Sequence, residues 1–199
     1  GEVPNVPLDA GEEPVGFVQR ALSLGWRVGF TAGGDDHHGH PGDPVRTGPE
    51  PFRYRDGLLG LWASDLTREA IWEALWHRRT VATTGARIIL GWALSGYFMG
   101  SEVPVDPGDA LVMQREIVVD AYAEERILAI EILRNNEVVH RTRTTSDQAV
   151  VHWADEDPLD LIALRPDASR AAFVFYYVRL LQADGEMAWA SPIWLELRE

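Results

Sequence analysis

Residues 111–133, LVMQREIVVDAYAEERILAIEIL, contain two runs of apolar and β-branched residues, Leu111–Ala123 and Ile127–Leu133, separated by a short charged stretch. Runs of this length and composition are typical of β-strands. Further runs of the same kind are Ile88–Leu94, Val138–Thr142, Val150–Trp153 and Phe173–Leu181. Turn-like residues separate the runs, and no convincing helix interrupts them. The sequence therefore predicts an antiparallel β-sandwich over residues 86–199.

The residues before Gly85 have a different pattern. Residues 13–24 predict an amphipathic helix, because apolar residues recur at helical spacing from Phe17 to Leu22. Residues 26–32, WRVGFTA, predict a short buried strand. A helix followed closely by a strand is typical of an α/β layer, so residues 1–85 are expected to form an α/β unit.

A second helix is predicted to start at Asp65 or Thr67, either of which can cap it. Its apolar stripe consists of Leu66, Ala70, Ile71, Ala74 and Leu75. Such isolated elements would expose their apolar faces to water. Residues 13–32 and 57–82 are therefore expected to bury these faces against the sandwich or against a second copy of the chain.

The composition excludes several kinds of chemistry. The 199 residues carry 31 acidic and 18 basic side chains, and the net charge of −13 repels polyanions, so nucleic-acid binding through charge is not expected. All basic residues are Arg and there is no Cys, which excludes lysine-based catalysis, disulfides and thiolate metal sites. No apolar run approaches the roughly 20 residues that span a bilayer, so no membrane partner is expected. The compartment stays open.

Residues 33–42, GGDDHHGHPG, hold the densest group of metal-ligand side chains, directly after the expected strand. Loops at the carboxyl ends of parallel strands are where α/β folds bind ligands. In an extended segment residues two apart point the same way, so Asp35 and His37 can face one metal ion while Asp36 turns aside. Carboxylate and imidazole together suit Zn, Mn or Fe(II). A solvated turn rich in Asp, His and Gly is the alternative explanation.

Three further features are weaker candidates for binding. His38 and His40 can contact a metal ion or substrate, although His40 can also simply shape the turn. Arg87 can bind a substrate phosphate through a bidentate contact. The backbone N–H groups of residues 83–85, TTG, can bind an anion, or the segment can be a tight turn that needs Gly for geometric reasons.

Tryptophans and acidic clusters raise two other kinds of site. Eight Trp residues suggest sugar stacking, but Trp72 and Trp76, four residues apart on the second predicted helix, fit interior or interdomain packing better. The acidic residues 155–157, DED, suggest calcium, but they lack an ordered ligand spacing and fit a solvated turn.

The segment Gly34-Asp35-Asp36-His37, after an apolar strand, resembles the last metal-binding motif of the PHP (polymerase and histidinol phosphatase) superfamily. Four stretches also resemble a bacterial branch known as DUF3604. They are residues 37–42 (HHGHPG), 66–71 (LTREAI), 78–88 (RRTVATTGARI) and 99–102 (MGSE). Together these motifs cover about residues 26–102.

The resemblance implies that full-length relatives form a distorted (β/α) barrel, bind two or three divalent metal ions, and hydrolyse phosphate esters or remain uncharacterised. Asp35 and His37 match the closing ligands of that site. No His precedes His37, so the other ligands must come from earlier barrel strands. Residues 1–85 are then the last strands and helices of the barrel, and residues 86–199 are an accessory sandwich.

This interpretation makes the chain part of a metal-dependent phosphoesterase-like hydrolase that acts on a small phosphate or related ester. A catalytic metal normally needs at least three protein ligands, so these 199 residues alone are expected to be inactive and to hold no tightly bound metal ion. The expected partner is the missing N-terminal barrel half, and a second copy of the chain in a homo-oligomer is the other candidate. The alternative is a non-catalytic Ig-like binding or scaffolding module of unknown ligand.

Overall fold

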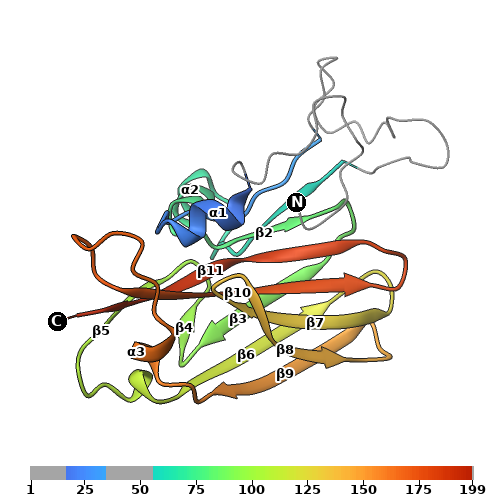
Figure 1. Cartoon of the computed structure of the whole chain (residues 1–199). Helices are drawn as coiled ribbons and strands as arrows, with labels where there is room; N and C mark the ends of the chain where they lie inside the picture. The colour runs from blue at the N-terminus through green and yellow to red at the C-terminus, as the bar shows by residue number, and fades with distance from the viewer. Residues whose placement is uncertain (1–16, 35–55, 199) are drawn as a thin grey trace, which may run out of the picture.

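The computed structural model of the chain describes residues 17–34 and 56–198 (Figure 1). The helices are α1 (Val18–Ser23), α2 (Arg68–Trp76), the 3-10 turn η2 (Ala110–Val112) and α3 (Leu159–Ile162). The strands are β1 (Leu58–Leu61), β2 (Thr80–Thr83), β3 (Ile89–Leu94), β4 (Tyr97–Phe98), β5 (Glu102–Val105), β6 (Arg115–Tyr122), β7 (Ile127–Arg134), β8 (Glu137–Arg143), β9 (Gln148–Asp155), β10 (Phe173–Gln182) and β11 (Met187–Leu197).

The strands form two sheets that pack face to face. The larger sheet has the order β1-β2-β11-β10-β7-β8, with β5 beside the far half of β11, and the smaller sheet has the order β4-β3-β6-β9. Every described pairing is antiparallel except that of β5 with β11. The sandwich predicted from the sequence is therefore confirmed.

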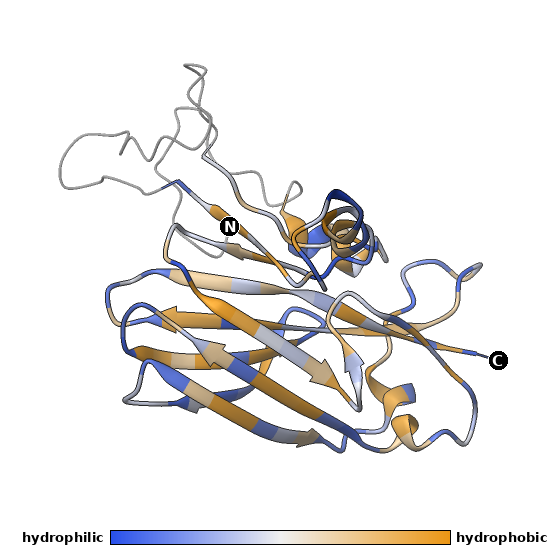
Figure 2. Ribbon diagram, turned by 180° about the vertical axis from the view of Figure 1, so that it is seen from behind, coloured by the Kyte–Doolittle hydropathy of each residue, from blue (hydrophilic) through white to orange (hydrophobic). Residues whose placement is uncertain are grey.

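The main core lies between the two sheets. Strand β6 alternates strictly between buried and exposed residues, as expected where one face of a strand meets the core and the other meets water. The same alternation of hydrophobic and hydrophilic residues is visible along the strands in Figure 2. Trp92 on β3 is the largest side chain of this core, and its indole N–H donates to the carbonyl of Ser191 at 3.0 Å.

A second, smaller core covers the outer face of the larger sheet. It consists of Leu22, Leu133, Phe173, Phe175, Tyr177 and Trp194, with Val28 and Phe30 packed against them. Leu22 comes from α1, and Val28 and Phe30 come from the extended segment that follows it. Figures 1 and 2 show α1 and α2 on this side of the larger sheet, away from the smaller one. The order of layers is therefore helices, larger sheet, smaller sheet.

The expected α/β barrel fragment is wrong. Strands β1 and β2 pair antiparallel, and β2 continues antiparallel onto β11, so both strands extend the sandwich. Residues 26–34 are extended but join no strand ladder. The apolar residues of this segment pack over the second core instead. A short apolar run in a sequence fits a buried strand equally well, so the sequence could not separate the two. The division at residue 85 stays a prediction.

Helix α2 follows the sequence prediction closely. Thr67 is its N-cap, and the Thr67 hydroxyl accepts a hydrogen bond from the N–H of Ala70 at 3.2 Å. The helix ends at Trp76 with His77 as its C-cap, and Arg78 then adopts a left-handed conformation with φ 54°. This turn leads the chain directly into β2.

Candidate functional site

The predicted metal ligands Asp35 and His37, and the weaker candidates His38 and His40, lie outside the described residues. Arg87 is described, and its side chain is exposed between β2 and β3. Within residues 17–34 and 56–198, no ion pair occupies its guanidinium. Among these described residues the Arg87 charge has no ionic partner, which leaves it available to an anion.

Gly34 and Asp56, the described residues on either side of the predicted metal loop, are in contact. A Cβ atom on Gly34 would lie 2.4 Å from Oδ2 of Asp56, so the Asp56 side chain would have to shift to admit one. A Cβ atom on Gly57 would lie 2.8 Å from Cβ of Ala32 and 3.1 Å from the carbonyl oxygen of Thr83. Residues 32–34, 56, 57 and 83 thus form one rim of the sandwich, which we call the β2 rim.

The extended segment that leads to the β2 rim is fixed by specific contacts. The N–H of Phe30 donates to Oγ of Ser191 at 2.8 Å, and this hydroxyl also bonds Oγ1 of Thr80 at 2.7 Å. A Cβ atom on Gly29 would lie 3.0 Å from both Cβ of Arg78 and Oγ1 of Thr80, so the segment packs closely against the start of β2. These contacts fix where the chain reaches residue 34.

The backbone groups of residues 83–85 do not form an anion site. The N–H of Thr84 donates to the carbonyl of Met187 at 3.0 Å, and the N–H of Gly85 donates to Oγ1 of Thr83 at 3.2 Å. Gly85 has φ 128°, a conformation that side chains rarely adopt. The segment is therefore a tight turn between the sheets, as the geometric interpretation predicted.

A buried polar cluster joins the two sheets at the end of β9. Arg115 is fully buried, and its Nη2 lies 2.9 Å from Oδ1 of Asp155, which is 2% exposed. The other carboxylate oxygen accepts from Oη of Tyr176 at 2.7 Å and from Nη1 of Arg134 at 2.7 Å. Arg115 and Asp155 belong to the smaller sheet, and Tyr176 and Arg134 belong to the larger one. The Asp155 carboxylate thus links both sheets.

The sequence interpretation missed this cluster, because it placed residues 155–157 in a solvated turn. That holds for Asp157, which is 63% exposed, but not for Asp155. The available signal was the position of Asp155 two residues after the apolar run Val150–Trp153, where a carboxylate at the end of a buried strand needs a cationic partner.

The pKa of Asp155 lies below its ordinary value of 3.8. Burial opposes ionisation, but the hydrogen bonds from Tyr176 and Arg134, the backbone N–H of Asp157 and the charge of Arg115 outweigh it. Burial also raises the pKa of the Tyr176 phenol, which therefore stays a hydrogen-bond donor.

We predict that ionised Asp155 stabilises the fold above pH 3.8, and that this contribution is lost as the pH falls through the lower pKa of the folded state. Urea unfolding of wild type and Asp155→Asn, measured from pH 7 to pH 2, checks this. The difference between their free energies of unfolding should be constant at neutral pH and shrink below pH 3.8. A difference that stays constant down to pH 2 would contradict it.

Helix α2 carries an open groove on the side that faces away from the sandwich. Trp72, Glu73, Trp76 and His77 line it, and its volume is about 350 Å³. The rings of Trp72 and Trp76 stack on each other 6.2 Å apart, and their side chains are 64% and 70% exposed. We call this feature the α2 groove. The apolar stripe that was expected to be buried in this helix is buried at Ala70 and Ala74 and half-buried at Ile71, but Leu66 and Leu75 are exposed.

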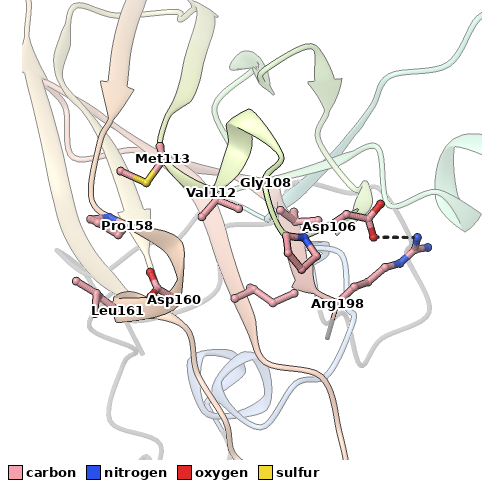
Figure 3. A pocket seen from close by; sticks show the side chains of 11 residues that line it. Asp106, Gly108, Val112, Met113, Pro158, Asp160, Leu161 and Arg198 are labelled. Carbon is pink, nitrogen blue, oxygen red and sulfur yellow. Dashed lines mark hydrogen bonds and ion pairs between the residues drawn. The ribbon is translucent and has the colours of Figure 1, made fainter.

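A second groove, of about 560 Å³, lies between the β5–η2 turn, α3 and the end of β11 (Figure 3). Most of its walls are apolar, with Met113 and Leu161 strongly exposed. Arg198 and Asp106 pair with each other at 3.4 Å, so the Arg charge is already used. The remaining charged side chain, Asp160, is acidic, which disfavours a phosphate ester in this groove.

The described residues contain neither a metal-binding cluster nor a membrane-spanning helix. Within residues 17–34 and 56–198, no group of three or more His, Cys, Asp or Glu side chains is arranged to hold a metal ion. None of the helices in the same ranges is long and apolar enough to cross a membrane.

Relatives of this chain occur in Chlamydia. An uncharacterized protein of Chlamydia pneumoniae is 37% identical over 186 residues, which cover 94% of this chain and 30% of the relative. Uncharacterized proteins of Chlamydia trachomatis and Chlamydia muridarum are 34% and 32% identical with the same coverage. The chain thus spans less than a third of the length of these relatives. No solved structure matches it.

A family comparison agrees with the sequence motifs. The matched stretch contains β1, α2 and the strands from β2 to β5, and so it includes both Arg87 and the α2 groove. Residues 50–105 match the family described as Protein of unknown function (DUF3604), which confirms the DUF3604 part of the resemblance seen in the sequence.

Proposed function

We propose that this chain contributes Asp35 and His37 to the metal centre of a PHP-type, phosphoesterase-like hydrolase, whose other ligands come from the rest of a longer polypeptide. One carboxylate and one imidazole fit a divalent Zn, Mn or Fe ion but are too few for a catalytic site, which normally has three protein ligands. The 30% coverage of the chlamydial relatives supports a longer polypeptide as the source of the others.

The contact between Gly34 and Asp56 is the observation that carries the proposal. It brings Gly34 and Asp56, the described residues on either side of the predicted metal loop, together at the β2 rim. Three residues of chain cannot take His37 farther than about 11 Å from Gly34, and four cannot take Arg87 farther than about 14 Å from Thr83. Chain length therefore limits how far Asp35, His37 and Arg87 can lie from the β2 rim, which supports a shared site there.

This arrangement assigns roles to the residues of the chain. Asp35 and His37 bind the ion, and Arg87 orients the phosphate of the substrate and offsets its charge. A divalent ion bound there supplies Lewis-acid activation and lowers the pKa of a bound water. His38 and His40 are candidates for contacts with the ion or the substrate. The substrate class is a small phosphate or related ester.

We predict that Asp35→Ala and His37→Ala each weaken Mn²⁺ binding by the chain at least about tenfold, because even partners outside the ligand shell change metal affinity by 10–100-fold. Electron paramagnetic resonance of free Mn²⁺ during titration measures this, also for weak sites. Asp36→Ala and His38→Ala are the matched controls, with the same residue types one position away. Equal effects at Asp35 and Asp36 would refute the proposed ligand pair.

A second candidate function is a non-catalytic binding or scaffolding module. The β-rich fold is compatible with it, and the exposed Trp72 and Trp76 favour it, because a surface of this kind marks an interaction site. The same titration separates the two functions, since a purely scaffolding module has no Mn²⁺ affinity that depends on Asp35 and His37.

A further inference from the structure

The apolar side chains of this protein are unevenly covered. The described chain has nineteen strongly exposed large hydrophobic side chains, and ten of them fall in residues 17–34 and 56–76. These two stretches make up about a quarter of the described residues. The sandwich covers most of its own apolar residues, whereas the layer that contains α1, β1 and α2 does not. The excess therefore points to a missing covering layer on this side.

Helix α2 shows this imbalance most clearly. Ala70 and Ala74 are buried against the sandwich, while Trp72 and Trp76 are exposed. Residues two apart on a helix point about 200° apart, so the large aromatic rings point directly away from the body that the small Ala residues contact. A surface helix normally has the reverse arrangement, with its large apolar residues turned inward. The outward side of α2 thus exposes two large aromatic rings beside the charged Glu69 and Glu73.

Strand β1 also has apolar side chains and a sheet edge that no described segment covers. It is the edge strand of the larger sheet, paired on one side with β2. Leu58 and Leu59 are each 39% exposed on it. Natural proteins protect edge strands with charges, Pro or a covering segment, and the sequence of β1, LLGL, has neither charge nor Pro. A covering segment is therefore expected beside β1 as well.

We propose that α2, through the α2 groove and the neighbouring edge of β1, is the docking surface for the remainder of a longer polypeptide of the kind found in the chlamydial relatives. This inference rests on the proposed function, which needs the same remainder for its other metal ligands. Two observations select this occupant. Each relative aligns with 94% of the chain and has 70% of its length outside the alignment. The surface also lies within the stretch that matches the family.

The groove suits a largely apolar partner. Trp72 and Trp76 together present on the order of 300 Å² of ring surface. Glu73 and His77 sit at the margin of these rings, where an interface has its polar rim. The two stacked rings are anchors of the type that dominate interface energetics, because they are large, rigid and amphipathic. A cationic partner is not required, since the groove contains only one acidic side chain.

The absence of Cys allows a direct test by thiol labelling. Glu73→Cys places a thiol in the α2 groove, and Glu137→Cys places one on exposed β8, at the opposite edge of the larger sheet. Both variants are made in the 199-residue chain and in a chimera, in which the chain replaces the aligned 186 residues of the Chlamydia pneumoniae relative and every Cys of that relative is changed to Ser.

We expect a maleimide to react equally fast at both positions in the chain alone. In the chimera, the rate at position 73 should fall at least tenfold while the rate at position 137 stays unchanged. Equal rates in the chimera would overturn the proposal. Protection of position 73 in the chain alone, with a dimer seen by light scattering, would also overturn it and assign the surface to a second copy.

A second measurement needs no chimera. The double variant Trp72→Ser/Trp76→Ser of the chain alone should keep its thermal midpoint within about 2 °C, as exposed surface substitutions do, and should aggregate less. A fall of more than about 5 °C would show that the rings support the sandwich itself, and would refute the docking role. The labelling rates and the thermal midpoint do not depend on metal. An Asp35→Ala variant that binds Mn²⁺ as well as wild type would therefore refute only the metal site, and unprotected labelling at position 73 would refute only the docking surface.

Discussion

Asp155→Ala is expected to lower the free energy of unfolding by about 3–5 kcal/mol, the range found when one partner of a buried ion pair is removed. The reason is the number of donors that this carboxylate satisfies. Without it, the fully buried Arg115 loses its charge partner, and Tyr176 and Arg134 lose their hydrogen-bond acceptor. Equilibrium unfolding in urea at pH 7, with circular dichroism as the signal, measures the change.

The neighbouring Asp157→Ala is the matched control. Both carboxylates pair with Nη1 of Arg134, at 2.7 Å and 2.8 Å, but Asp157 is 63% exposed and Asp155 is 2% exposed. An exposed ion pair contributes at most about 1 kcal/mol, so Asp157→Ala should change stability by less than that. If the two variants lost the same stability, the buried cluster would not be what joins the sheets.

Gly100→Ala is expected to cost about 3–5 kcal/mol, because overpacking adds to backbone strain at this position. Gly100 has φ 89°, and a Cβ atom there would lie 2.0 Å from the carbonyl oxygen of His77 and 2.8 Å from the carbonyl carbon of Arg78. Its N–H also donates to the carbonyl of Pro192 at 2.9 Å. The new methyl group must push the end of α2 away from the sandwich.

Gly96→Ala separates the clash from the strain. Gly96 has φ 87°, nearly the same as Gly100, but a Cβ atom on it would meet no atom within 4 Å. This variant should therefore show only the left-handed backbone cost of about 1–2 kcal/mol. Thermal or urea unfolding of the two variants gives the comparison. Equal losses would mean that the chain near residue 100 adjusts freely and that α2 is not held against it.

The sandwich could be predicted from the sequence because its strands either alternate between apolar and polar residues, as in β6, or form nearly continuous apolar runs, as in β7. The capped helix α2 was predictable for the same reason, since Thr67 and the spacing of Ala70 and Ala74 are local signals. The barrel expectation failed at residues 26–32. Their apolar content was correctly seen, but whether such a segment pairs in a sheet or packs across its face depends on Ser191 and Trp194, far along the chain.

The candidate site was predictable only in part. Its residue types come from the local motif, and the structure adds the position of the β2 rim, which depends on contacts between Gly34, Asp56 and Thr83 that no local pattern encodes. The exposure of Trp72 and Trp76 was not predictable either. An apolar residue on a helix indicates burial, but the sequence does not say which body buries it, or whether that body is within these 199 residues.

The position of β11 has a consequence for biosynthesis. This strand pairs with β10, β2 and β5, yet it is the final strand of the described chain. A ribosome that adds about 5–20 residues per second needs roughly 4–16 s to travel from the end of β5 to the start of β11. During that interval the nascent β5 has no strand to join and β2 can pair only with β1, so the larger sheet can close only after residues 187–197 have left the exit tunnel.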